Sequence, residues 1–94
     1  MKAYKAFHKD MTGFNGFQYK IGETYEINES PSCCHCGFHA CTEFEDVFFY
    51  YNPVFEHIHI CEVEILGNMS YNDIDSKIAT NKIKIGKELT SHDM

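Results

Sequence analysis

The sequence predicts an α+β fold, with a small, largely antiparallel sheet or partly rolled barrel and one central helix. Several segments alternate two sets of side chains, as strands do when one face is buried. One segment near the middle instead carries apolar residues at helical spacing. A length of 94 residues and an aromatic content of 15% are sufficient for one domain, residues 1–94, with a core of large rings.

Three extended segments are predicted in the N-terminal half. Residues 1–8 form the first, in which two sets of side chains alternate: Ala3, Lys5 and Phe7 against Tyr4, Ala6 and His8. Residues 17–27 form the second, and Gly22 interrupts it as a turn or bulge. Residues 38–41 form a short third strand before the predicted helix.

The central helix is predicted to follow Thr42, which acts as its N-cap with Glu45 as the capping-box partner. Acidic residues in the first turn favour the positive end of the helix dipole. Four residues spaced i, i+3, i+4 and i+7 give it an apolar face: Phe44, Val47, Phe48 and Tyr51. Pro53 ends the helix.

The longest predicted strand covers residues 55–66. Its side chains divide between two faces: Phe55, His57, His59, Cys61, Val63 and Ile65 against Glu56, Ile58, Ile60, Glu62, Glu64 and Leu66. Residues 67–75 are rich in turn formers and are predicted to be a loop. Residues 77–85 form the last predicted strand, with an interruption near Asn81.

The charge distribution indicates the kind of partner. The net charge is −6, the chain contains no Arg, and no Lys lies between Lys20 and Lys77, a stretch that holds eleven of the fourteen acids. This balance argues against direct binding of nucleic acid or of anionic membranes, because both need basic residues. A basic protein surface is the predicted partner.

The predicted contact residues are acids and one aromatic residue on the helix and the long strand: Glu43, Asp46, Tyr50, Glu56, Glu62 and Glu64. Aromatic side chains beside acids are typical of interaction hot spots, although a solvated helix face explains the same pattern. The leading hypothesis is therefore a small non-enzymatic binding protein whose acids enter a basic cleft, with no catalytic residue and no cofactor. The absence of a long apolar run predicts a cytoplasmic protein.

A segment rich in Cys and His supports a different hypothesis, a small zinc protein or thiol enzyme. The candidate ligands are Cys34, Cys36, His39, Cys41, His57, His59 and Cys61. The competing interpretation is that these are buried thiols and core or interface histidines, because the spacing lacks a second C-x-x-C pair. A homodimer through Ile58 and Ile60, or through Phe49, is a third alternative.

A set of short motifs spans nearly the whole chain: Lys2–Thr12, Gly16–Tyr19, Gly22–Tyr25, Gly37–Cys41, Glu62–Gly67 and Ser76–Thr80. In this order they resemble a small domain family of unknown function from phages, prophages and Firmicute-type bacteria. The resemblance implies a context and no activity. The leading hypothesis names a host protein that handles nucleic acid or acts in defence as the target, because acids spaced on a rigid sheet can occupy sites built for phosphates. Many members have another polar pair where this chain has His35 and Cys36, so the resemblance implies no shared metal site.

A second resemblance is to the ADP-ribosyltransferase fold. Tyr4-Lys5 and Gly37-Phe38-His39, followed by residues 45–51, occur in the order of that fold. The resemblance implies a degenerate domain without activity, because Lys5 stands where the family has a catalytic Arg or His and no catalytic Glu is identifiable.

Overall fold

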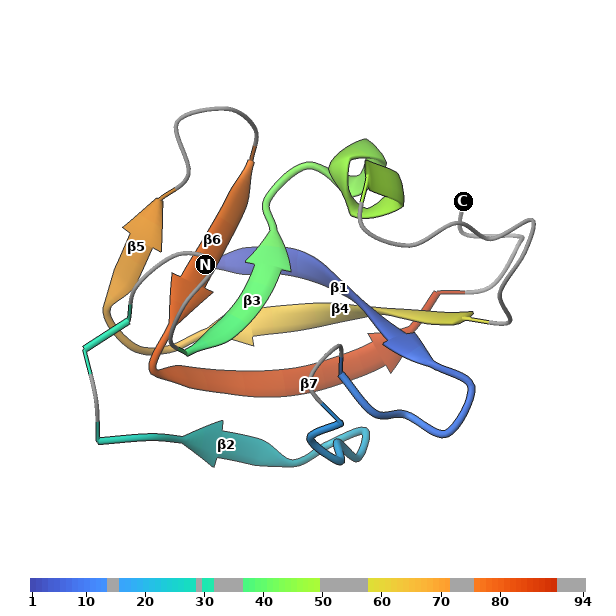
Figure 1. The fold of residues 1–94 in the computed structure, drawn as a ribbon, viewed down its shortest axis with the longest axis horizontal. Coiled ribbons are helices and arrows are strands. Elements are labelled where there is room, and N and C mark those ends of the chain that lie inside the picture. The colour runs from blue at the N-terminus through green and yellow to red at the C-terminus, as the bar shows by residue number, and fades with distance from the viewer. Residues whose placement is uncertain (14–15, 29, 32–36, 50–57, 72–75, 90–94) are drawn as a thin grey trace.

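The computed structural model describes residues 1–13, 16–28, 30–31, 37–49, 58–71 and 76–89 (Figure 1). Along these residues lie seven strands and one 3-10 helical turn: β1 (Lys2–His8), β2 (Thr24–Glu26), β3 (Phe38–Cys41), η1 (Phe44–Phe49), β4 (Ile58–Ile65), β5 (Met69–Tyr71), β6 (Lys77–Thr80) and β7 (Lys82–Glu88). No helix in this part of the chain is long and apolar enough to cross a membrane.

The seven strands form a single open sheet in the order β2-β7-β4-β1-β3-β6-β5, and neighbouring strands are antiparallel (Figure 1). The N-terminal strand β1 therefore lies in the middle of the sheet, between β4 and β3. Strands β2 and β5 are the two outer strands. The fold is all-β.

The predicted α+β class is wrong, because the predicted central helix, as far as the structure describes it, is only the 3-10 turn η1. The predicted capping box is replaced by contacts with Ser76, just before β6. The N–H groups of Thr42 and Glu43 donate to the backbone carbonyl and the Oγ of Ser76, at 3.1 and 2.9 Å. The Asp46 carboxylate accepts a hydrogen bond from the Ser76 N–H at 2.9 Å. Ser76 thus supplies, from outside the segment, acceptors for N-terminal N–H groups that the predicted helix would have left to its capping residues.

Two of the predicted strands are confirmed closely, and two segments differ. Strands β1 and β3 lie where they were predicted. The predicted strand at residues 17–21 is wrong, because this region contributes only an isolated bridge from Gln18 to Thr12, and strand pairing begins at Thr24. The predicted loop at residues 67–75 contains the unpredicted strand β5.

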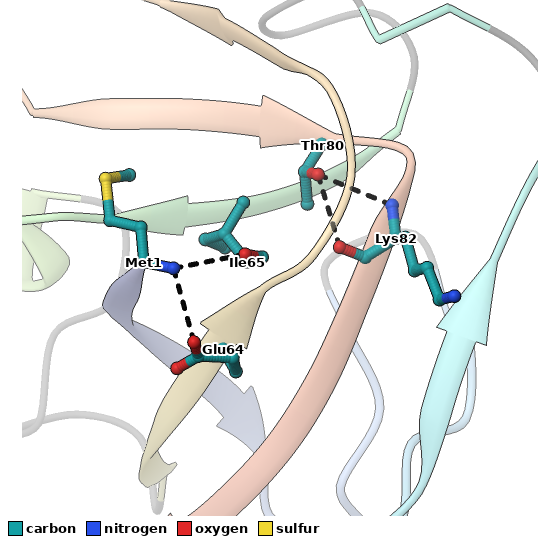
Figure 2. Close-up of polar contacts among 5 residues, drawn as sticks. All are labelled: Met1, Glu64, Ile65, Thr80 and Lys82. Atoms are coloured by element: carbon teal, nitrogen blue, oxygen red, sulfur yellow. Dashed lines mark hydrogen bonds and ion pairs between the residues drawn. The ribbon is translucent and has the colours of Figure 1, made fainter.

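The predicted interruption of the last strand near Asn81 is confirmed. Figure 2 shows that the Thr80 hydroxyl donates to the Lys82 carbonyl at 3.2 Å and accepts from the Lys82 N–H at 3.4 Å. These bonds span the turn between β6 and β7, which explains a polar side chain at Thr80 that is fully buried. Strand β4 begins at Ile58 among the described residues, so the predicted start at residues 55–57 lies outside them.

The sheet buries side chains on both of its faces. We call the first the main-core face; it holds the larger cluster, which includes Phe7, Cys61, Val63, Ile78, Ile83 and Ile85. We call the second the turn face; it carries the smaller cluster of Ala6, Cys41, Val47, Ile60 and Leu89, with η1 packed on it. The Tyr4 and Phe44 rings meet edge to face on the turn face, with centroids 5.7 Å apart.

A β-bulge determines which side chain of β7 lies opposite Cys61 on the main-core face. Val63 pairs with Ile85, whereas Cys61 pairs with Glu88, so β7 has one extra residue between these two pairs. Without the extra residue Lys87 would lie opposite Cys61. The bulge replaces that lysine with Glu88 beside His59, and bulges commonly re-aim side chains in this way.

Candidate functional site

The two acids of β4 that were predicted to bind a partner lie beside basic groups of this chain. The Lys2 ammonium forms an ion pair with the Glu62 carboxylate at 2.8 Å. Figure 2 shows the N-terminal amine of Met1 between the Glu64 carboxylate, at 3.3 Å, and the Ile65 carbonyl, at 3.2 Å. The hydrogen bond from Lys2 to Glu62 and the charge of that carboxylate raise the pKa of Lys2.

The ladder of the sheet adds more positive charge around these acids. Lys2 and Lys84 lie opposite Glu64 on the two neighbouring strands, β1 and β7. The acidic stretch of the sequence is therefore interrupted in space at β4 by lysines from both ends of the chain. Glu62 and Glu64 contribute to internal pairing in this arrangement.

The acids at the start of η1 differ from Glu62 and Glu64 in their exposure and in their contacts. Glu43 and Glu45 are exposed, while Asp46 is half-buried and holds the Ser76 N–H. The Ser76 contacts fix the start of η1 to the start of β6, so the two exposed carboxylates extend from an anchored turn. Of the other predicted contact residues, Tyr50 and Glu56 lie outside the described residues.

Lys5 is a buried cation. It lies on the main-core face, and its side chain is surrounded by aromatic residues. Its Nζ donates a hydrogen bond to the His39 carbonyl at 2.6 Å and lies 5.7 and 5.3 Å from the ring centroids of Phe7 and Tyr19. No carboxylate in the described part of the chain forms an ion pair with it.

Burial of the charge lowers the pKa of Lys5 to about 8, and the charge of Lys77 acts in the same direction. Burial, followed by the charges of Lys5 and Lys77, lowers the pKa of His39 to about 4. His39 is therefore neutral at neutral pH, while Lys5 still carries its proton. Groups whose pKa values are shifted this far occur at functional sites and also in structural charge networks.

The rings that cover Lys5 form one connected cluster with mostly edge-to-face contacts, which ring quadrupoles favour. Tyr19 is its centre, with centroids 5.1 Å from Phe7, 4.8 Å from Phe17 and 5.3 Å from Tyr25. Phe17 is 41% exposed and forms the outer surface of the cluster. Lys5 was not among the predicted site residues, although its place with Ala3 and Phe7 in the strand alternation indicated a lysine on an apolar face.

The described members of the proposed metal and thiol set do not come together. Tyr4 pairs with Cys41 and with Glu62, whereas Lys5 pairs with Cys61. Partners across a ladder share a face, so His39 and Cys41 lie on the turn face, and His59 and Cys61 lie on the main-core face. The described residues contain no group of three potential metal ligands, and Cys34, Cys36 and His57 lie outside them.

Cys61 also lacks the properties of a nucleophile. It is fully buried, and burial, followed by the charge of Glu88, raises the pKa of its thiol to about 12. A reactive cysteine needs the opposite shift, because the thiolate is the nucleophile.

His59 has a structural role in the same corner of the sheet. Its Nδ1 lies 2.7 Å from the Glu88 carboxylate, and its Nε2 lies 3.1 Å from the Lys9 carbonyl. Both partners are acceptors, so both bonds form together only when the ring is the doubly protonated imidazolium. The hydrogen bond to Glu88 is the main cause of a raised pKa for His59.

These observations define a small all-β domain with an acidic strand neutralised by its own lysines, an exposed acidic turn and a buried lysine beneath an aromatic cluster. The chain belongs to the family described as Domain of unknown function (DUF7666), whose family model matches residues 1–94. The predicted membership of a family of unknown function is thereby confirmed. No curated protein and no solved structure matches the chain.

Proposed function

We propose that this domain is a non-enzymatic binding module that engages a basic surface of a protein partner. The observation that carries the proposal is the exposure of Glu43, directly before η1, and of Glu45 in η1, a turn that the Ser76 contacts hold in place. Carboxylates on an anchored turn need little ordering when they meet a partner, which favours affinity. Glu62 and Glu64 are secondary contacts in this proposal, because basic groups of the chain already neutralise them.

The net charge of −6 supports the same kind of partner. An excess of one charge attracts the opposite charge over long distances and raises the rate of encounter. The resemblance to small phage and prophage domains supports a host protein in the cytoplasm as the partner. A basic cleft that handles nucleic acid, or the corresponding site of a defence protein, is the surface that exposed carboxylates fit best.

Single charge reversals with a matched control test this proposal. Glu43→Lys and Glu45→Lys reverse charge at the start of η1, while Glu23→Lys makes the same change at an exposed acid before β2. The immobilised variants are exposed to host lysate at low and at high salt, and the captured proteins are compared by mass spectrometry. We expect the η1 variants to lose proteins that wild type captures at low salt and that the control retains.

Raising the salt concentration is expected to release the same proteins from wild type, because salt screens exposed charges. Capture that does not respond to salt would contradict the electrostatic proposal. Equal losses in all three variants would show that net charge, rather than the position of η1, determines binding.

A further inference from the structure

Strand β5 leaves one edge of the sheet without a strand partner among the described residues (Figure 1). Its three residues, Met69, Ser70 and Tyr71, carry no charge. Outer strands usually carry charges, Pro or bulges, because their open backbone groups otherwise pair with another chain. The opposite outer strand, β2, carries Glu26, which is exposed.

The hydrogen-bond pattern shows which backbone groups of β5 point outward. The Asn81 N–H donates to the Asn68 carbonyl at 3.4 Å, next to the ladder between β5 and β6. Hydrogen-bonded and non-hydrogen-bonded pairs alternate along antiparallel strands, so Ser70, two residues further on, is bonded to β6. The N–H and C=O groups of Met69 and Tyr71 therefore point toward the outer edge.

The side chains of β5 extend the apolar main-core face to this edge. Met69 is partly buried against the main core, and Tyr71 lies opposite the buried Ile78. The Tyr71 hydroxyl contacts the Met69 sulfur at 3.8 Å, so the two side chains lie on the same face. Tyr71 is nevertheless 64% exposed, the largest value among the exposed large hydrophobic residues that the structure describes.

We propose that β5 pairs with β5 of a second copy of this chain, antiparallel, about a two-fold axis at Ser70. This register places Met69 of each copy opposite Tyr71 of the other, and each such pair exchanges both of its N–H···O=C bonds through the outward groups. Tyr71 then packs on the methionine of the second copy as it already does on its own. A second copy fits this edge because two chains of net charge −6 repel each other less at an uncharged contact.

The dimer is expected to be weak. A stable interface buries about 1,200–2,000 Å² in total, and a three-residue strand supplies only part of that area. Association therefore depends on protein concentration. It does not involve Glu43 or Glu45, so the binding proposed for η1 and this dimer can fail independently.

Sedimentation equilibrium over a series of protein concentrations measures the association. Tyr71→Lys places an ammonium beside the second copy's strand, and Ile21→Lys makes the same change at a residue that is 45% exposed and lies outside β5. We expect Tyr71→Lys to raise the dissociation constant at least about tenfold and Ile21→Lys to leave it unchanged. A wild-type protein that stays monomeric throughout, or equal weakening by both variants, would overturn the proposal.

Cysteine cross-linking tests the register. At a non-hydrogen-bonded pair the two Cα atoms lie about 4.5 Å apart, within the reach of a disulfide. Ser70→Cys is therefore expected to give a disulfide-linked dimer through position 70 under mild oxidation, while Tyr71→Cys is not expected to link to itself. Peptide mapping separates this product from links through the five native cysteines. Cross-linking no greater than in wild type, or equal in both variants, would overturn the two-fold register.

Discussion

Lys5 places a positive charge where the solvent cannot stabilise it. Its ammonium has a backbone carbonyl and two aromatic faces as partners, and these offset only part of the cost of burial. A pKa lowered from 10.5 to about 8 corresponds to roughly 3 kcal/mol of lost stability while the group is charged. The fold therefore tolerates Lys5 at an appreciable cost in stability.

The sign of this shift fixes a pH dependence. Between about pH 8 and pH 10.5 the unfolded chain keeps a proton on Lys5 that the folded chain has released, so this group makes stability rise with pH. Lys5→Met removes the effect while it keeps an apolar stem of similar length. We expect the variant to be at least as stable as wild type at pH 7, since apolar replacement of a buried charge is often neutral or stabilising. Urea unfolding at several pH values measures the difference.

Comparing Lys5→Met with wild type separates the contribution of Lys5 to the pH dependence of stability from the contributions of other groups that titrate at alkaline pH. Cys61, whose pKa is raised to about 12, makes stability fall above its ordinary pKa in both proteins. Lys20→Met, at an exposed lysine, is the matched control. If the advantage of Lys5→Met over wild type were the same at pH 7 and pH 10.5, the assigned pKa of Lys5 would be wrong.

At the scale of elements, the strands were predictable where side-chain alternation was strict. Strand β1 was predicted from that alternation, as was the part of β4 that the structure describes. Strand β5 was missed because its short segment lies among turn-forming residues and, within the part of the chain that the structure describes, pairs only with β6. The helix prediction failed because helical spacing is local, while the contacts with Ser76 that shape η1 come from 30 and 33 residues away.

The predictions of functional residues were likewise limited by contacts between segments that are distant in the sequence. Glu43 was selected as an acid of the predicted helix, and it is exposed although the described part of that helix is only the turn η1. The pairing of Glu62 with Lys2 depends on which strands become neighbours, and one sequence does not specify this. The predicted dimer seam at Ile58 and Ile60 is wrong for the same reason, because β4 is an interior strand and Ile60 is buried.

The bulge in β7 depends on Gly86. A Cβ atom at this position would lie 2.7 Å from the backbone carbonyl oxygen of Glu62, closer than a side-chain carbon approaches an oxygen. Gly86→Ala is therefore expected to lower the free energy of unfolding by about 1–3 kcal/mol, because the strand must shift to relieve the contact. Lys84→Ala, at an exposed position of the same strand, is the control. Urea unfolding that shows equal stability for both variants would contradict the close approach.

For the whole molecule, the fold brings together acidic and basic residues that are far apart in the sequence. The acids are concentrated between Lys20 and Lys77, and the lysines lie toward the two ends of the chain. Strands β1 and β7 then enter the sheet on either side of β4, which brings lysines next to the central acids. The stretch without lysine in the sequence is therefore not a continuous acidic surface at β4, and the proposed binding rests on the exposed Glu43 and Glu45.

The ion pair between Lys2 and Glu62 can be tested by substitutions whose effects on stability and on partner binding are measured separately. Glu62→Lys places two ammonium groups side by side at Lys2, so the urea midpoint is expected to fall, and Lys2→Glu is expected to act likewise through two carboxylates. The double variant Lys2→Glu/Glu62→Lys restores opposite charges and the net charge of wild type, and its midpoint is expected to recover most of the loss. In the lysate capture experiment the double variant is expected to retain most of the wild-type capture, because Glu43 and Glu45 are unchanged and Glu62 is a secondary contact. A double variant that binds as poorly as Glu45→Lys would show that the Glu62 carboxylate of β4 is a principal contact.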